Sequence, residues 1–222
     1  MENTAAAPSR KKMLAYFILS IVINSLGNAI TVSLNLGSAL WTASSVNLAR
    51  VTPISLSWWL FISGAVVIVT NAVILRKIQI GRIIGNLIFM LPFSYLVGWF
   101  ASLLTKVGIT TLPLAVRIIL DCLGVVLIAI AISIYQRVNW MLHPVDDLMQ
   151  IIRFKFFHGN STVAQRVTFT PPIIAIIITL IYTNHIYAIN IGTLFALLFQ
   201  GALVGIADRV IFPSLKHQNL DK

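Results

Sequence analysis

Six long apolar stretches fill most of this chain, and each is long enough to cross a lipid bilayer as a helix. A hydrocarbon core about 30 Å thick needs roughly 20 apolar residues in helical form. Inside lipid, every backbone polar group must find its partner within the protein, so helices are the expected form. The sequence therefore predicts an all-α polytopic membrane protein with spans at Met13–Leu34, Leu56–Leu75, Ile83–Leu104, Leu114–Tyr135, Val167–Ile186 and Ile189–Phe212.

The composition excludes a water-soluble fold. Hydrophobic residues make up 58% of the 222 residues and charged residues only 10%, which is too little polar surface to cover a soluble globule. A net charge of +10 in a soluble protein would suggest nucleic acid. Here the basic residues sort by membrane side instead, so we expect no nucleic-acid partner.

The basic residues also predict the topology. If the N-terminus is cytoplasmic, only Arg50, Lys106 and Arg117 of the 16 lysines and arginines lie outside. This bias places both termini in the cytoplasm of a bacterial cell membrane, with anionic headgroups as expected lipid partners. The first span runs beyond the apolar region of a signal peptide and contains Asn24 and Asn28, so we interpret it as an uncleaved helix.

The chain divides near Pro113 into two parts of three spans each. The two parts, residues 13–104 and 114–212, and the short tails, residues 1–12 and 213–222, make up one membrane domain. Ile78-Gln79-Ile80-Gly81 leads into the third span, and Ile189-Asn190-Ile191-Gly192 leads into the sixth. An odd number of spans per half predicts two inverted three-helix repeats, which are typical of secondary transporters. The alternative is that short apolar helices resemble one another by chance.

A semi-polar connector follows the first span of each half, at residues 35–55 and 139–166, and each is predicted to contain a short helix. A helix that starts at Pro144 would carry Asp146 and Asp147 in its first turn, where the helix dipole favours them. Its mixture of basic and apolar residues favours an amphipathic helix in the cytoplasmic leaflet. A re-entrant helix that faces a solute path is the alternative.

Short motifs in both halves carry a family resemblance. They are Leu36-Gly37, Trp41 and Ile191-Gly192-Thr193. They resemble the marks of the YczE/YyaS/YitT group of bacterial integral membrane proteins, which are a Leu-Gly before a Pro-Trp-Asp turn and a later Gly-Thr. Leu40 and Thr42 replace the Pro and Asp of that turn, whereas Pro144 and Asp146 would correspond to them in the second half. The resemblance implies tandem three-helix halves and no assigned biochemical function.

Polar side chains inside the spans are the functional candidates, because lipid offers them no partners. Those of the first span recur at helical spacing and form one polar stripe: Ser20, Asn24, Asn28, Thr31 and Asn35. The stripe either bonds neighbouring helices or lines a solute path. Trp41 after the first span, and Gln200 roughly 16 Å into the last one, are further candidates for the path.

Asp121 is the only carboxylate far inside a span, about 10 Å along its helix. Arg117 precedes it by one turn, so a structural ion pair between the two is the favoured interpretation. Proton coupling, or docking of a cationic solute, is the alternative.

The sequence predicts neither an enzyme nor a cofactor. It contains no Ser-His-Asp order and no phosphate loop, and Cys122 is the single cysteine. His143 with Asp146 or Asp147 could hold a metal, but a helix start explains these residues without one. The leading hypothesis is a permease-like transporter that moves an unidentified small solute or ion between the halves. A substrate-capture subunit of a multi-component importer and a non-transporting scaffold or regulator are the alternatives, and a homo-oligomer or a complex with transporter subunits stays open.

Overall fold

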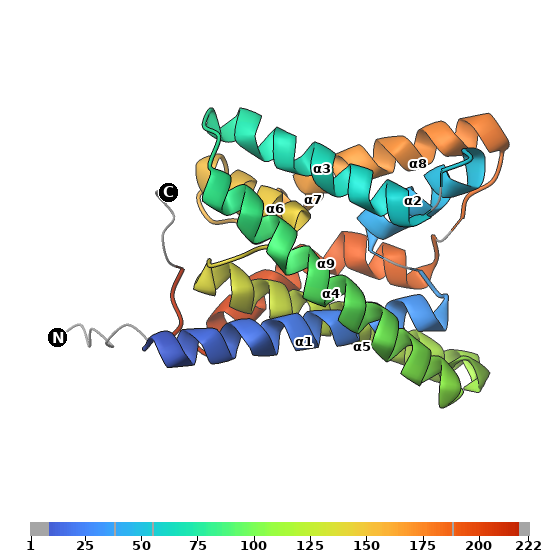
Figure 1. Cartoon of the computed structure of the whole chain (residues 1–222). Helices are drawn as coiled ribbons and strands as arrows, with labels where there is room; N and C mark the ends of the chain where they lie inside the picture. Colours follow the sequence, from blue (N-terminus) through green and yellow to red (C-terminus); the bar gives the residue numbers. More distant parts are fainter. Residues whose placement is uncertain (1–8, 38, 55, 188, 218–222) are drawn as a thin grey trace.

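The computed structural model describes residues 9–37, 39–54, 56–187 and 189–217, which form helices joined by turns and confirm the all-α prediction. The outer parts of both predicted tails, with Lys222, lie outside the described residues. In chain order the helices are α1 (Arg10–Leu34), α2 (Leu40–Val51), α3 (Leu56–Leu75), α4 (Ile80–Lys106), the 3₁₀ turn η1 (Ile109–Thr111), α5 (Leu114–Val138), α6 (Pro144–Lys155), α7 (Ser161–Thr168), α8 (Thr170–Thr183) and α9 (Ile191–Val210), as seen in Figure 1.

Five segments of the described chain are long and apolar enough to cross a membrane. They are α1, α4, α5, the α7–α8 segment Ser161–Thr183, and α9. The second predicted span falls on α3, a helix of 20 residues, but the apolar stretch within its described residues, Phe61–Leu75, is shorter than a span. The multi-pass prediction is confirmed for five of the six stretches.

The fifth predicted span, Val167–Ile186, is displaced in the structure. Its helical segment begins earlier, and it is divided at Phe169 into α7 and α8. Pro171 and Pro172 follow that division; they have no backbone N–H to offer, and proline also disfavours a helical residue before it. Asn184, in the left-handed conformation with φ 55°, ends α8.

The centre of the fold is the antiparallel pair α1 and α5, which make the most extensive contact between helices. Met13 near the start of α1 packs with Val138 at the end of α5. Where the helices cross, two glycines face each other: a Cβ added to Gly27 would lie 2.7 Å from the carbonyl oxygen of Gly124. Small residues allow such close backbone contact, which is how helices associate in lipid.

Each central helix has a parallel neighbour. α4 lies along α1, because Ser25 Oγ donates to the carbonyl of Phe93 (3.5 Å) and Ser33 Oγ donates to that of Ala101 (3.4 Å). α9 lies along α5 in the same direction. A carboxylate at the end of α9, Asp208, accepts from α5, so the two helices end together.

α3 and α8 form a second layer, seen at the top of Figure 1. The short helices join this layer to the rest: α2 packs on α3 and α8, and α6 packs on α3 and α7. Nine of the twelve residues of α6 are buried, including Asp147 and Arg153. The predicted surface helix is therefore corrected: α6 lies mostly within the protein, with Asp147 and Arg153 buried and Lys155 exposed at its end.

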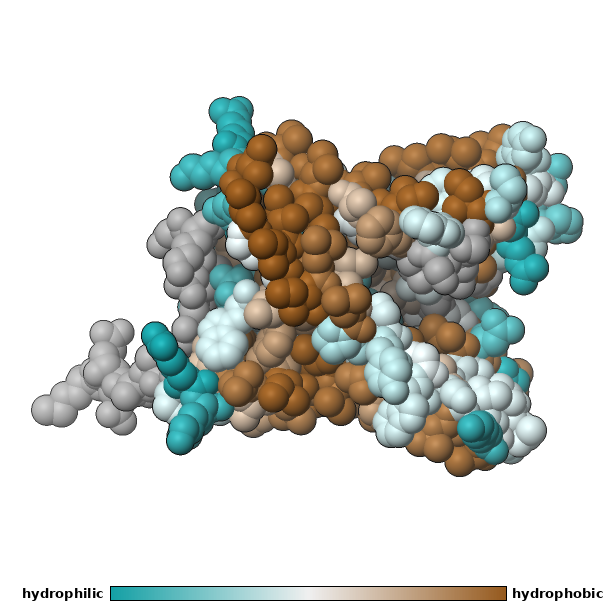
Figure 2. Space-filling model, in the orientation of Figure 1, coloured by the Kyte–Doolittle hydropathy of each residue, from teal (hydrophilic) through white to brown (hydrophobic). Residues whose placement is uncertain are grey.

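The two ends of the helix bundle are distinct. α1 begins and α9 ends on the same side, where the rings of Tyr16 and Phe212 lie 4.6 Å apart. We call this side the terminal end and the opposite side the distal end. Figure 2 shows an apolar surface over most of the visible face, with hydrophilic residues gathered towards these two ends.

Polar residues occupy the interior of the helix bundle, in contrast to its apolar surface. Asn24 is 3% exposed and Asp121 is 1% exposed, whereas Leu91 and Tyr182 are 74% and 81% exposed. An apolar exterior around a polar interior is what a lipid environment requires, since polar groups there must face other helices or a wet cavity. The chain is a multi-pass membrane protein.

The glycine crossing generates a first prediction. Gly27→Ala should lower the free energy of unfolding by about 1–3 kcal/mol, because the new methyl group meets backbone that cannot rotate away. Gly98→Ala in α4 is the matched control, since a Cβ there meets nothing within 4 Å. Thermal unfolding of both variants in detergent measures the difference. Equal midpoints for the two variants would contradict the close crossing.

Candidate functional site

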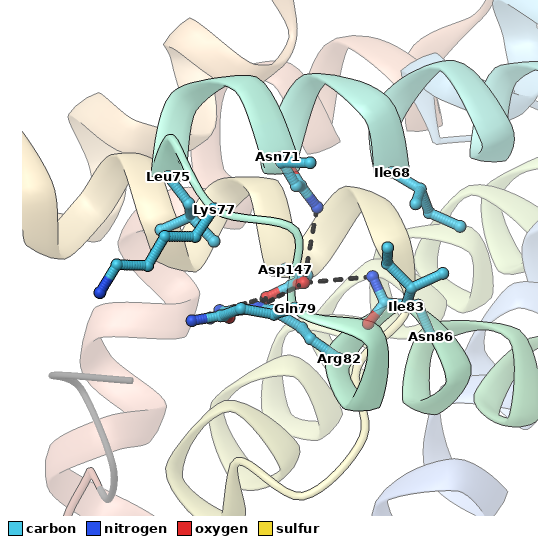
Figure 3. Close-up of a pocket in the computed structure, with 10 residues that line it drawn as sticks. Ile68, Asn71, Leu75, Lys77, Gln79, Arg82, Ile83, Asn86 and Asp147 are labelled. Atoms are coloured by element: carbon cyan, nitrogen blue, oxygen red, sulfur yellow. Dashed lines mark hydrogen bonds and ion pairs between the residues drawn. The ribbon is translucent and has the colours of Figure 1, made fainter.

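One polar site lies at the terminal end and holds α6 against α3 and α4 (Figure 3). Asp147, in the first turn of α6, is fully buried. Arg82 at the start of α4 donates through Nε to Asp147 Oδ2 (2.9 Å) and through Nη2 to Asp147 Oδ1 (2.6 Å). Asn86 Nδ2 donates to Oδ2 (3.1 Å), and Asn71 Nδ2 of α3 lies 3.5 Å from the same oxygen. We call these four residues the terminal-end cluster.

A small pocket opens beside the terminal-end cluster. Its free volume of about 10 Å³ gives room for about one water molecule. Its other lining residues come from α3, α4 and the turn between them: Ile68, Ala72, Leu75, Lys77, Gln79 and Ile83. The recess is too small for an organic solute.

In the terminal-end cluster, the positive charge of Arg82 compensates the negative charge of Asp147. Two oxygens of one carboxylate accept hydrogen bonds from one guanidinium, which is the strong, geometrically specific form of an ion pair. The side chain of Arg82 keeps 22% of its surface exposed, while that of Asp147 keeps none. Removing either partner would leave the other charge uncompensated, so the pair fixes how α6 sits against α4.

A second line of polar groups runs between α1, α5 and α6. Asn28 Nδ2 donates to Asn24 Oδ1 (3.0 Å) along α1, and the side chain of Asn24 interacts with the hydroxyl of Tyr135 on α5. That hydroxyl donates to Asp146 Oδ2 of α6 (2.5 Å). We call Asn28, Asn24, Tyr135 and Asp146 the central polar line.

Burial shifts the titration of the groups where the central polar line reaches α6. It raises the pKa of Asp146 to about 7, although the hydrogen bond from Tyr135 opposes this. It lowers the pKa of His143 to about 4, so the imidazole is neutral at pH 7. The 3.9 Å approach of His143 Nδ1 to Asp146 Oδ2 is therefore not a charged pair at that pH.

A third cluster ties the end of α9 to α5, α6 and the residues that follow α9. Asp208 accepts from Ser133 Oγ (2.7 Å) and Arg153 Nη2 (2.5 Å), and His217 Nε2 lies 3.4 Å from it. Arg137, 1% exposed, donates to the carbonyl oxygens of residues that include Leu215 (3.1 Å). These contacts hold the chain after α9 against the bundle, which is a structural role.

Asp121 lies towards the distal end, away from these clusters. It is buried, and neither of its carboxylate oxygens has a hydrogen-bond partner among the described residues. Arg117 instead donates through Nη2 to the carbonyl oxygen of Leu34 (2.6 Å), and the described chain contains no ion pair between Arg117 and Asp121. The favoured Arg117–Asp121 pair is therefore absent, because Arg117 caps the C-terminal end of α1.

The structure distributes the other predicted path residues over separate places. Thr31 bonds only within α1, to the carbonyl of Asn28, and its methyl group packs against Gly124. Trp41 of α2 packs between two apolar clusters, with a buried indole N–H that finds no partner among the described residues. Gln200 in α9 is 4% exposed, and its side-chain oxygen is likewise without a described partner.

The described residues contain no group of three or more His, Cys, Asp or Glu side chains that could hold a metal ion. The arrangement offers amides, hydroxyls and isolated carboxylates inside a membrane protein. Such groups can bind and pass a polar solute or a proton.

The comparisons with known proteins agree with this architecture. Residues 11–209 match a family of unknown function, DUF6198. The chain belongs to this family. It is also 25% identical, over 149 residues, to the uncharacterized protein YyaS of Bacillus subtilis (strain 168). The aligned region covers 62% of this chain and 67% of YyaS. No solved structure matches significantly.

The similarity to YyaS confirms the resemblance that the short motifs indicated. The motif residues of this DUF6198 member meet in space: the backbone N–H of Gly192 donates to the carbonyl of Leu36 (3.0 Å), and a Cβ on Gly37 would collide with Thr193. The Leu-Gly turn after α1 and the Gly-Thr start of α9 therefore form one contact at the distal end.

Sequence reasoning missed the terminal-end cluster. It assigned Asp147 to the helix dipole and passed over Asn71 and Asn86, although both stand within otherwise apolar helices. An asparagine in such a helix needs a partner, and that was the available signal. Tyr135 and Asp208 were also missed, because their partners come from distant parts of the chain.

The terminal-end cluster generates a second prediction. Arg82→Ala should lower the free energy of unfolding by about 3 kcal/mol, because it leaves Asp147 as an uncompensated buried charge. The double variant Arg82→Ala/Asp147→Asn should be more stable than Arg82→Ala alone, since it removes that charge as well. Denaturant or thermal unfolding in detergent measures both.

Arg166→Ala is the control for this comparison. Arg166 is exposed on α7 and forms no ion pair in the described part of the chain, so its removal should change stability by less than about 0.5 kcal/mol. A loss as large as that of Arg82→Ala would mean that arginine content, and not this pair, sets the stability.

Proposed function

We propose that this DUF6198 member is a permease-like carrier of the bacterial cytoplasmic membrane, which moves a small solute or ion along a path between two inverted halves. The observation that carries the proposal is the central polar line. Asn24 and Asn28 on α1, Tyr135 on α5 and Asp146 on α6 form a connected set of polar groups in the interior of a membrane protein. Polar groups at such depth are costly, and they typically mark a solute or proton path.

The helix directions support six crossings. α1 and α4 run parallel, so the chain between them must return across the bilayer, and α3 with 20 residues spans about 30 Å. α5 and α9 are also parallel, and the α7–α8 segment returns between them. Both termini then lie on one side, and the excess of Lys and Arg at the ends and loops of that side favours the cytoplasm.

The internal match between the halves supports inverted repeats. Asn35 ends α1 and Asn139 ends α5, both left-handed, with φ 52° and 51°. Each is followed by a twelve-residue helix, and each of these helices packs on the other half: α2 on α8, and α6 on α3. In secondary transporters that are built from inverted repeats, the substrate site lies at the interface between the repeats.

The two halves differ in their middle helix, and an ion pair at the terminal end supports a gate there. α3 is a single helix, whereas its counterpart is divided into α7 and α8, and Gly201 of α9 lets α7 approach closely: a Cβ there would lie 2.8 Å from Cα of Thr162. At this end the Arg82–Asp147 pair holds α6 to α4. Opening towards the cytoplasm would require that pair to separate, so the terminal-end cluster is the proposed cytoplasmic gate.

A third prediction concerns the topology. In a Cys122→Ser background, single cysteines at Val107 and Ile186, exposed at the distal end, should react with a membrane-impermeant maleimide on intact cells. Cysteines at Ile78 and Phe156, exposed at the terminal end, should react only after the membrane is permeabilised. The reverse pattern, or labelling of all four from outside, would contradict a cytoplasmic position of both termini.

The fourth prediction concerns transport. A metabolite library is screened for compounds that raise the melting temperature of the purified protein, because a ligand that binds only the folded form stabilises it by mass action. Stabilising compounds are then offered to proteoliposomes. Wild-type vesicles should accumulate at least one of them, and Tyr135→Phe, which removes the hydroxyl bonded to Asp146, should reduce the initial rate at least tenfold.

Tyr95→Phe is the matched control, because it makes the same change at a tyrosine that is 74% exposed. It should transport at the wild-type rate. If no compound shifts the melting temperature and wild-type vesicles accumulate none of the panel, the carrier proposal is contradicted. Equal transport rates for the two Tyr variants would contradict the proposal that the central polar line is part of the solute path.

A further inference from the structure

The carboxylate of Asp121 occupies an unusual position in α5. It is 1% exposed and lies seven residues after the helix begins, or about 10 Å along it. It rests directly against the first turn of α9, because a Cβ added to Gly192 would overlap the carboxyl group. The glycine at this place therefore makes the room that the carboxyl group occupies.

Neither oxygen of Asp121 receives a hydrogen bond from the described residues. Two donors of this region point elsewhere: the N–H of Gly192 donates to the carbonyl of Leu36, and Nη2 of Arg117 donates to that of Leu34. A buried, ionised carboxylate with no partner is strongly disfavoured. A carboxyl group that carries a proton avoids that cost.

The surroundings favour a proton over a metal ion. Metal ions that prefer oxygen, such as Ca²⁺ and Mg²⁺, require about six or more ligands. Here one carboxyl group meets a glycine of a packed helix, and the nearby carbonyls of Leu34 and Leu36 already accept hydrogen bonds. A proton needs one oxygen lone pair and no additional volume.

We propose that Asp121 is the proton-binding site of this carrier, protonated in the conformation described here; its use in transport rests on the proposed function. A proton taken from water at the distal end forms an O–H bond on the carboxylate and changes its charge from −1 to 0. Loss of that proton restores a carboxylate one helical turn from Arg117, whose Nε is buried without a described partner. The carboxylate then competes for the guanidinium that now caps α1 at Leu34, and this links protonation to the contact between α1 and α5.

Few other titratable groups face this site. On α5 they are Arg117 and Cys122, and the Cys122 thiol neighbours the carboxyl group. The described parts of α1 and α9 that pack here, Ile30–Leu34 and Ile191–Leu197, contain no titratable side chain. A pH response of the contact between α5 and the start of α9 is therefore expected to come from Asp121 with Arg117 as its neighbour.

The fifth prediction tests the proton directly. Full-length protein in nanodiscs of phosphatidylethanolamine and phosphatidylglycerol is examined by infrared spectroscopy at neutral pH. The wild type should show the C=O stretch of protonated carboxyl groups, and Asp121→Asn should lose one component of it. Asp146→Asn, which removes another buried carboxyl group, is the control and should retain the component that Asp121→Asn removes.

Two outcomes would overturn the proposal. The first is a spectrum of folded Asp121→Asn that loses no component at neutral pH. The second is a rise in melting temperature when choline chloride is replaced by NaCl, seen in the wild type and absent from Asp121→Asn, which would assign the site to a metal cation. If Asp121→Asn does not fold, solid-state NMR of wild-type protein labelled with ¹³C at the aspartate carboxyl decides, because five ionised aspartates at neutral pH exclude a protonated Asp121.

This experiment separates the two proposals. If Asp121 is protonated and the protein moves no solute, the carrier proposal is contradicted and the proton-site proposal stands. If Asp121 is ionised and proteoliposomes accumulate a solute, only the proton-site proposal is contradicted. When both hold, uptake by wild-type vesicles should rise at least fivefold under an inward proton gradient, and uptake by Asp121→Asn should not respond to it.

Discussion

The close crossing of α1 and α5 is the contact on which the rest of the structure depends. Lipid tails are as apolar as leucine, so helices in a bilayer gain little from burying apolar surface and associate through close packing and hydrogen bonds. Gly27 and Gly124 bring the two backbones together where the helices cross. α4 is then placed along α1, and α9 along α5, in the same relative direction. Asn24 of the first helix is consequently buried, and its side chain interacts with the hydroxyl of Tyr135.

The two ends of the bundle each contain a buried carboxylate, but only the one at the terminal end has hydrogen-bond donors among the described residues. At the terminal end Asp147 is neutralised by Arg82 and receives a hydrogen bond from Asn86, so its ionised form is supported. At the distal end Asp121 has no such donor, so its ionised form is penalised. The start of a long helix lies beside each site, α4 at the first and α9 at the second. The same fold therefore holds a paired carboxylate, Asp147, beside the start of α4 and an unpaired one, Asp121, beside the start of α9.

Hydrophobic length and helical spacing predicted much of this fold, and long-range partners account for what they missed. The apolar stretches located the long helices, and the Asn24–Asn28 spacing located a stripe that the structure places in the interior. The alternation of charge in α6 indicated a surface helix, because a helix that buries ionised residues among distant partners has the same sequence pattern as one that faces headgroups. Spacing also indicated a pair between Arg117 and Asp121, but the unsatisfied carbonyl at the end of α1 is a competing acceptor that no local pattern shows. Asp147 and Arg82 are 65 residues apart in sequence, so only the folded chain brings them together.

α6 shows why the terminal end should be the more rigid of the two. Adjacent residues at its start bind different helices: Asp146 accepts from Tyr135 of α5, and Asp147 accepts from Arg82 of α4. Its last turn sends Arg153 to Asp208 of α9. A shift of α6 in any direction must therefore break at least one charge-assisted hydrogen bond, and each of these is stronger than a neutral one. α2, its counterpart, forms no ion pair in the described chain; Asn47 exchanges two hydrogen bonds with the backbone of Tyr187, and Arg50 lies over the ring of the same tyrosine. Fewer charge-assisted hydrogen bonds therefore hold α2 than hold α6. On the carrier proposal, access to the central polar line opens first from the distal end, where Asp121 lies.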